Sequence, residues 1–272
     1  MDTDDTPETF QLHDDQARRR SARVAVAVLA LGAVGLGGCA LSPAGSGELR
    51  EDDAGQAVDE LRTGLRVPGV PSDSDSAEEP TVLHRVSTDD PVVFVTLDDG
   101  THPDPQALDL VREQDMPVSL FLNEDPVRRH GDYFAQYLAL GDHVHSHTRT
   151  HPDLTTLGTD AQTDEICGMA EVLDETYGAT GQVGPLARTP YGASDESTLR
   201  AAESCGIEHL IHWSVVAEDG GLSYALGDGL RPGDIVLAHF TPGLAEDLEA
   251  VRDAADEAEL EVARLEDYVP AE

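Results

Sequence analysis

The sequence is poor in basic residues. It contains no lysine, and its 17 basic residues are outnumbered by 54 aspartates and glutamates, which gives a formal net charge of −37. So acidic a chain repels phosphate backbones and anionic headgroups, and we therefore predict that nucleic acid is not a partner. Two explanations of this composition stay open, a GC-rich genome that favours arginine codons and an adaptation to high salt.

Aromatic residues and cysteines are also scarce. Aromatic side chains make up 4% of the 272 residues, so a long row of sugar-stacking subsites is not expected. The three cysteines, Cys39, Cys167 and Cys205, fit no zinc-ribbon spacing. In an oxidising compartment the last two are a candidate disulfide, and the alternative is a pair of buried free thiols.

The uncharged run at residues 24–36 is too short to cross a bilayer as a helix. It follows a basic patch at residues 18–23 and ends in Leu36-Gly37-Gly38-Cys39, a pattern that is typical of a signal peptide. Its end resembles the lipobox of bacterial lipoproteins, in which the cysteine becomes the lipid-modified first residue. We therefore predict an extracytoplasmic protein, lipid-anchored through Cys39 to the outer face of the bacterial cell membrane. A secretory peptide cut elsewhere and an uncleaved anchor are the alternatives.

Composition divides the chain into three parts. Residues 1–38 form the predicted signal region. Residues 39–80 are rich in Ser, Gly, Pro, Asp and Glu, bury too little apolar surface to fold, and are interpreted as a flexible acidic tether. Residues 81–272 are predicted to form a single catalytic domain, because strand-like and helix-like patterns alternate there.

That alternation predicts a mostly parallel sheet or barrel covered by helices. Apolar, β-branched runs favour strands at 92–96, 118–122, 210–211 and 235–237. A capping box, Thr159 to Gln162, predicts the start of a helix that ends at Gly178. Ser194 is expected to cap a second helix, and a third is expected over residues 245–259. In such folds, polar groups at the carboxyl ends of strands face the active site.

Two polar motifs follow predicted strands. Asp98 and Asp99 end the strongest strand, where two adjacent carboxylates are costly to bury unless a metal or a base compensates them. An ordinary Asp-Gly turn is the alternative. His147 and His151 can present two imidazoles to one point if the chain makes a local turn before Pro152. A solvated polar loop is the alternative there.

Together with Arg188-Thr189-Pro190-Tyr191-Gly192 and Leu237-Ala238-His239, these motifs resemble, in order and spacing, those of the polysaccharide deacetylases, the NodB-type enzymes of carbohydrate esterase family 4. The resemblance spans roughly residues 82–269, with Leu97 in place of the family's phenylalanine. It implies a distorted (β/α) barrel and the hydrolysis of acetyl groups on a polysaccharide, most of all from N-acetylglucosamine-type sugars.

The resemblance also assigns roles to single residues. Asp99, His147 and His151 would bind a divalent metal, Zn²⁺ first, with Co²⁺, Mn²⁺ and Ni²⁺ as alternatives. Asp98 would be the general base, held by Arg188, and His239 the general acid. The remaining expected contacts are the Tyr191 N–H beside Pro190, for the oxyanion, and Trp213 with Leu237, for the acetyl methyl group.

The Trp block departs from the family pattern. The family has an aspartate after the tryptophan that partners the acid histidine, whereas Ser214 and two valines follow Trp213 here. Glu218 or Asp219 is the candidate replacement as partner of His239. His145 is an additional histidine, which we expect near the ligands or facing solvent and not binding the metal.

Three functions other than a polysaccharide N-deacetylase are to be compared with these motifs. An O-acetyl esterase acting on a xylan-type polymer would use the same site with a different leaving group. A catalytically weak, glycan-binding surface lipoprotein is a second alternative, favoured by the missing aspartate and opposed by the retained motifs. A solute-binding transport component is excluded because two similar lobes do not fit the ordered length. The expected partners are an acetylated polysaccharide and, through the lipid anchor only, the membrane, with the protein as a monomer.

Overall fold

The structure is a computed structural model, and it describes residues 80–269. The predicted signal region, Cys39 and nearly all of the predicted tether lie outside the described residues. The three domain boundaries therefore stay predictions. Within residues 80–269, no helix has both the length and the apolar character needed to cross a membrane.

Ten strands form one sheet, in the order β1-β6-β5-β4-β3-β2-β9-β7-β8, with β10 pairing beside β2. The described strands are all parallel to their neighbours except β7 and β8, which pair antiparallel. The strand bounds are β1 Thr81–Leu83, β2 Val92–Asp99, β3 Val118–Leu122, β4 His143–Ser146, β5 Val183–Ala187, β6 His209–Ile211, β7 Val215–Glu218, β8 Gly221–Tyr224, β9 Ile235–His239 and β10 Glu261–Val262.

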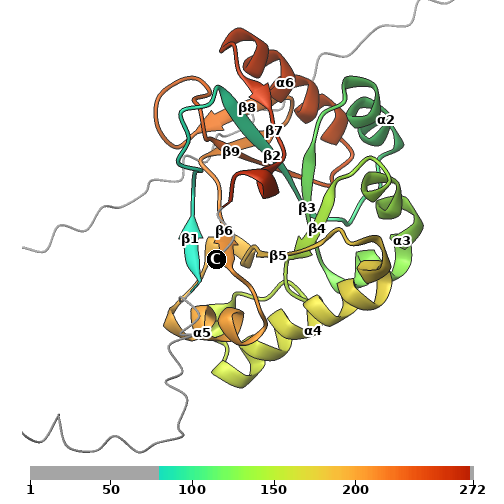
Figure 1. Ribbon diagram of the computed structural model, residues 1–272, viewed down its shortest axis with the longest axis vertical. Coiled ribbons are helices and arrows are strands. Elements are labelled where there is room, and N and C mark those ends of the chain that lie inside the picture. The colour runs from blue at the N-terminus through green and yellow to red at the C-terminus, as the bar shows by residue number, and fades with distance from the viewer. Residues whose placement is uncertain (1–79, 270–272) are drawn as a thin grey trace, which may run out of the picture. The chain divides into compact units, whose positions relative to one another are not determined.

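Helices cover the outside of this curved sheet (Figure 1). Their bounds are α2 Pro105–Gln114, α3 Glu124–Leu138, α4 Thr159–Tyr177, α5 Glu196–Ser204 and α6 Leu244–Glu257. Helix α2 packs on α6, α3 packs on α4, and α4 packs on α5. The path of paired strands ends at β1 on one side and at β8 on the other, so the barrel is open between them in the part described. The predicted distorted (β/α) barrel is confirmed.

Side chains alternate between the two faces of the sheet and so divide the core. On β2, Val93, Val95 and Leu97 face the helices and belong to the large outer core. Phe94 faces inward and packs with Phe121 of β3 and other interior residues. The same alternation turns Thr96 and Asp98 inward at the carboxyl end of β2, which is where the candidate site lies.

Two predicted helix starts are wrong in detail. Helix α4 is capped by Gly158 with no side-chain hydrogen bond, so the predicted capping box at Thr159 does not form. Instead, the Gln162 side chain turns inward, donates to the Leu157 carbonyl and accepts a 2.7 Å hydrogen bond from Thr198 Oγ1. Helix α5 is capped by Asp195 and not by Ser194, through a reciprocal capping box with Thr198.

The C-terminal segment closes the opposite, amino end of the barrel. Leu265, in the 3₁₀ turn Leu265–Asp267, packs into the interior core with Phe94. Glu266 Oε1 lies 2.6 Å from Nε2 of His145, whose ring has no exposed surface. His145 is therefore buried, so the solvent-facing alternative was wrong, and it is not among the three residues that gather as candidate ligands.

Candidate metal centre and active site

Strand β2 and the turn after it deliver the two carboxylates. Asp98 is 2% exposed and points into the barrel, whereas Asp99 has a φ of 74° and turns the chain out of the strand. Gly100 follows with a φ of 84°, and a Cβ there would lie 2.8 Å from Phe134 Cζ. Only glycine fits this position without displacing the core, so the Asp-Gly step fixes where both carboxylates point.

The two histidines come from the end of β4. His147 follows Ser146, the last residue of that strand, and its Nδ1 donates a 2.9 Å hydrogen bond to the Arg188 carbonyl. That bond puts the ring proton on Nδ1 and leaves the Nε2 lone pair free to bind a metal. Thr148 and His151 then adopt positive φ values of 65° and 60°, which bend the chain into a tight turn.

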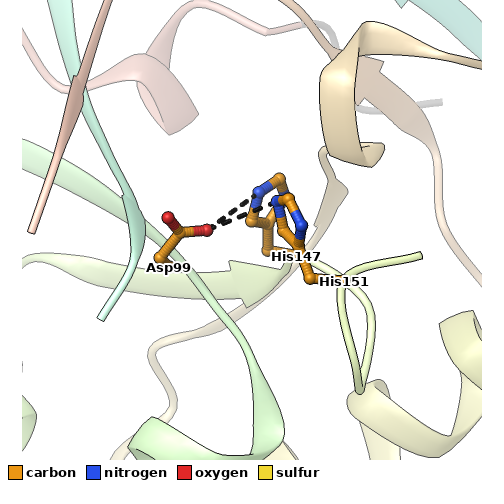
Figure 2. Close-up of side chains that lie close together, drawn as sticks. All are labelled: Asp99, His147 and His151. Atoms are coloured by element: carbon orange, nitrogen blue, oxygen red, sulfur yellow. Dashed lines mark ion pairs between the residues drawn. The ribbon is translucent and has the colours of Figure 1, made fainter. Parts of the chain in front are cut away.

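This turn brings both imidazoles to one carboxylate oxygen (Figure 2). Oδ1 of Asp99 lies 3.4 Å from Nε2 of His147 and 3.5 Å from Nε2 of His151. Oδ1 is buried and has no hydrogen-bond partner among the residues described. The three ligand atoms lie within 4.8 Å of one another. One carboxylate and two imidazoles form a donor set that suits Zn²⁺ and similar divalent ions, so these residues fit a metal.

The ionisable groups of this cluster shift one another's pKa values. Burial raises the pKa of the Asp99 carboxyl, but the imidazoles of His147, His151 and His239 outweigh it and hold that pKa below 3.8. Burial lowers the pKa of His147, and the carboxylates of Asp98 and Asp99 more than compensate, so its pKa lies above 6.5. For His151, burial and the neighbouring His147 lower the pKa below 6.5. The anionic form of Asp99 and the neutral form of His151 are thus favoured, as a cation requires, whereas His147 must release a proton when a metal binds.

A buried ion pair lies directly behind the cluster. Arg188 has no exposed surface, and its Nη1 lies 2.6 Å from Oδ1 of Asp98. Its other hydrogen bonds go to Thr96 Oγ1 and to the carbonyl oxygens of Ile211 and His212. Its guanidinium also lies over the Phe121 ring at 4.4 Å. Arg188 thus fixes the Asp98 carboxylate, whose other oxygen, Oδ2, lies 3.6 Å from Nε2 of His147.

His239 lies beside the carboxylates, but among the described residues no carboxylate forms a hydrogen bond or ion pair with its ring. It ends β9 and is paired in register with Asp98 of β2. Neither Glu218 nor Asp219 forms a hydrogen bond or ion pair with its ring, and within residues 80–269 no other carboxylate does so. The proposed replacement of the family aspartate by one of these two residues therefore fails.

The other predicted residues surround this centre. Tyr191 has a φ of 61°, is 71% exposed, and places its ring 4.9 Å from that of His151. Pro190 before it is buried. Trp213 is half-buried with its ring 5.7 Å from the Arg188 guanidinium, and Leu237 is buried two residues before His239 on β9. Cys167 and Cys205 form a disulfide that joins α4 to the end of α5.

His212 is a neighbour of the site that was not predicted. It is 6% exposed, and its Nε2 lies 3.2 Å from Thr189 Oγ1. Burial, His84 and Arg188 together lower its pKa to about 4, so this ring is neutral. The signal that would have found it is its place next to Trp213 at the end of a strand.

The fold and the site together define a (β/α) barrel protein with its polar cluster at the carboxyl ends of parallel strands. A family model for polysaccharide deacetylases matches residues 85–210. An uncharacterised protein of Streptomyces coelicolor is 40% identical over 197 residues, which cover 70% of this chain and 78% of that protein. A chitooligosaccharide deacetylase of Rhizobium leguminosarum bv. trifolii is 32% identical over 163 residues, or 57% of this chain and 74% of that protein.

Solved structures agree on the fold. A family 4 carbohydrate esterase from Bacillus anthracis superimposes with a TM-score of 0.60 at 22% identity, covering 70% of this chain and 87% of that one. The family model and the Rhizobium relative show that the chain belongs to the polysaccharide deacetylase family, the NodB-type proteins of carbohydrate esterase family 4. The family match at residues 85–210 includes both carboxylates, both histidines and Arg188, whereas Trp213 and His239 lie beyond it.

Proposed function

We propose that the protein is a metal-dependent deacetylase that removes acetyl groups from N-acetylglucosamine-type sugars of an envelope or extracellular polysaccharide. The observation that carries this proposal is the buried, unpartnered Oδ1 of Asp99 facing the Nε2 atoms of His147 and His151. Membership of the polysaccharide deacetylase family supports the deacetylation reaction. The chitooligosaccharide substrate in the name of the Rhizobium relative supports the sugar.

A divalent ion at Asp99, His147 and His151 would supply Lewis acidity toward water and the acetyl carbonyl, with Zn²⁺ as our first choice. Asp98 accepts the proton of the attacking water, because its Oδ2 is the carboxylate oxygen that Arg188 leaves without an ion pair. Arg188 keeps this carboxylate aligned through the 2.6 Å contact between its Nη1 and Oδ1 of Asp98. His239, in register with Asp98, donates the proton that the leaving amine needs.

Three further residues would bind the acetyl group. The backbone N–H of Tyr191, after buried Pro190, would donate to the oxyanion of the tetrahedral intermediate. Trp213 and Leu237 would contact the acetyl methyl group. The exposed Tyr191 ring would cover His151 and restrict the entry of water.

The test combines metal analysis with acetate release by the purified protein. We expect near-stoichiometric metal and acetate release from a chito-oligosaccharide, with both lost in His147→Ala. Asp98→Asn should keep the metal and lose about 10²- to 10⁴-fold in kcat, as is typical when a general base is removed. A wild-type protein that binds no metal after addition of Zn²⁺ would refute the proposal.

Two alternatives give different results in the same assay. Acetate released from acetylated xylan but not from the chito-oligosaccharide would identify an O-acetyl esterase with the same site. A catalytically weak glycan-binding protein is favoured because no carboxylate of residues 80–269 forms a hydrogen bond or ion pair with His239. Saturable glycan binding and bound metal without acetate release from either polymer would identify that function.

We also propose that the protein is anchored outside the cytoplasm through a lipid on Cys39. The basic patch, apolar run and lipobox-like residues 36–39 support this location, and so does the Cys167–Cys205 disulfide, because such bonds persist in oxidising compartments. Cell fractionation tests it. The wild-type protein should stay with the membrane and Cys39→Ser should not, and retention of both would contradict lipidation at Cys39.

A further inference from the structure

The turn that carries the two candidate histidine ligands is strained. Thr148 and His151 both have positive φ values, at 65° and 60°. A β-branched residue such as threonine rarely adopts this strained conformation, which persists only where the surroundings impose it. The alignment of both imidazoles with Asp99 therefore depends on the contacts that hold this turn.

One side of the turn is held by the start of α3. Asn123 Nδ2 donates to the carbonyl oxygens of His147, at 2.5 Å, and Thr148, at 3.0 Å. The Glu124 N–H donates to the Arg149 carbonyl, and Glu124 Oε2 accepts a 2.6 Å hydrogen bond from Arg149 Nε. Asn123 is 7% exposed, so it is part of the core as well as a contact of the turn.

The other side is held by Glu165 on α4. Its Oε2 accepts a 2.8 Å hydrogen bond from the Thr150 N–H, and its Oε1 accepts one of 2.6 Å from Thr150 Oγ1. Its carbonyl oxygen also accepts from the Arg149 N–H at 3.2 Å. Both carboxylate oxygens thus accept hydrogen bonds from Thr150, the residue just before His151. A charged acceptor makes these hydrogen bonds stronger than neutral ones.

Arg149 and α4 fit closely at this contact. A Cβ on Gly168 would lie 2.5 Å from Arg149 Cδ, so the arginine side chain runs directly across the helix there. Cys167, two residues after Glu165, is bonded to Cys205. The helix that supplies Glu165 is thus fixed to its neighbour, and it presents a rigid carboxylate to a strained turn.

We propose that Glu165 is a positioning residue for the candidate metal centre. By fixing Thr150, it holds the turn in which Nε2 of His147 and Nε2 of His151 face Asp99. The inference rests on the proposed function, because it assigns Glu165 a part in the affinity for the metal. Glu165 is half-exposed on a helix surface, so it can be replaced without opening the core.

The test measures metal affinity, apo-protein stability and acetate release in a small set of variants of the full chain. Glu165→Ala removes both carboxylate hydrogen bonds, and Glu165→Gln keeps one acceptor oxygen for Thr150. Glu171→Gln is the matched control, since it removes the same charge from an exposed site on the same helix. Thr150→Val removes the hydroxyl donor without changing any charge.

We expect Glu165→Ala to weaken Zn²⁺ binding in a competition titration by about 10- to 100-fold, the usual effect of removing a residue that orients a ligand. Glu165→Gln should recover part of this loss, and Glu171→Gln should stay within about twofold of the wild type, because it touches no ligand-bearing segment. Glu165→Ala and Thr150→Val should be non-additive in the double variant, because both remove the same contact.

Two outcomes would overturn the inference. If Glu165→Ala lowers the Tm of the apo protein but binds Zn²⁺ as tightly as the wild type, the residue is merely structural. If the two substitutions are additive in metal affinity, Glu165 does not act through Thr150. Failure of the proposed function is distinguishable, because it would appear as a wild-type protein that binds no Zn²⁺, and it would remove the inference with it.

Discussion

Arg188 combines complete burial with a charge. Its guanidinium has no exposed surface and pairs with Asp98 at 2.6 Å. Thr96 Oγ1 and two backbone carbonyl oxygens accept its other hydrogen bonds. Removing one partner of such a pair leaves an uncompensated buried charge, whereas removing both leaves none. The pair therefore contributes to function through the orientation of Asp98, and its stability depends on both members being present.

We predict that Arg188→Met destabilises the protein by about 3–5 kcal/mol at pH 7, because Asp98 is then buried without a partner. Asp98→Asn combined with Arg188→Met should recover part of this loss. Chemical denaturation measures both. Arg200→Met is the matched control, because Arg200 pairs with Glu196 at the same 2.6 Å on the surface, and it should cost less than about 1 kcal/mol. Equal losses for the two arginines would contradict the argument.

The residues of the candidate centre were predictable, but their depth in the barrel was not. Motif order placed Asp99, His147 and His151 together, and the structure brings them together. His143 and His145 alternate along β4 and share its inward face, and His147 follows directly after the strand. Which of them meets Asp99 and which meets Glu266 depends on how deep each lies along the barrel axis. The sequence does not encode that depth locally, and the solvent-facing alternative for His145 was wrong for this reason.

At the scale of elements, tertiary hydrogen bonds decide where helices begin. The sequence pattern at Thr159 satisfies the capping-box rule, yet the Gln162 side chain is bonded to Thr198 of α5. A hydrogen bond between α4 and α5 thus replaces the capping hydrogen bond expected within the first turn of α4. Helix α2 does follow its local signal, since Asp104 accepts from the Gln106 N–H and Pro105 is the first helical residue. That start signal was present in the sequence and was overlooked.

The disulfide between α4 and α5 closes a loop with a sequence separation of 38 residues. Constraining the unfolded chain over a loop of this length is worth about 4 kcal/mol in the chain-entropy model. We predict that Cys167→Ser with Cys205→Ser lowers the free energy of unfolding by up to that amount. The measurement is chemical denaturation in a Cys39→Ser background, so that no other thiol interferes. A reductant should destabilise the bonded protein to the same level and leave the double serine variant unchanged. A bonded protein that a reductant does not weaken would contradict the prediction.

At the scale of the whole molecule, the alternation of strands and helices predicted the barrel, because the central strands β2, β3 and β9 read as compact apolar runs. The open side between β1 and β8 and the closure of the amino end by the C-terminal segment were not predicted. Both depend on contacts between parts of the chain far apart in sequence. The His145–Glu266 pair joins residues 121 positions apart.

That pair gives the stability of the barrel a pH dependence. Burial raises the pKa of Glu266, but the hydrogen bond and the charge of His145, together with hydrogen bonds from Ser119 and the backbone, lower the pKa to about 2, from 4.5. A lowered folded-state pKa stabilises the fold above pH 4.5, and the contribution is lost as the pH falls from 4.5 toward 2. We predict that Glu266→Gln lowers the free energy of unfolding by about 3 kcal/mol at pH 7 and by clearly less at pH 3.

Denaturant titrations at the two pH values measure this difference. Glu261→Gln is the control, since Glu261 is an exposed residue of the same C-terminal segment. It should cost little at either pH. A cost for Glu266→Gln that is the same at pH 7 and pH 3 would show that the carboxylate charge contributes nothing to the closure.

The net charge of −37 acts on the molecule as a whole, and salt is the means to measure its effect. Like charges on a compact surface repel one another, and the unfolded chain relieves this repulsion by separating them. Screening shortens the range of repulsion from about 10 Å at 0.1 M salt to about 3 Å at 1 M. We therefore predict that the Tm rises steadily as NaCl increases from 0.1 M to 1 M. The buried Asp98–Arg188 pair is shielded from the salt and does not oppose the rise, whereas exposed pairs such as Glu196–Arg200 weaken only slightly. A Tm that stays constant or falls over this range would show that the acidic surface is not a source of instability. Composition alone would then account for the excess of carboxylates, and the high-salt explanation would lose its support.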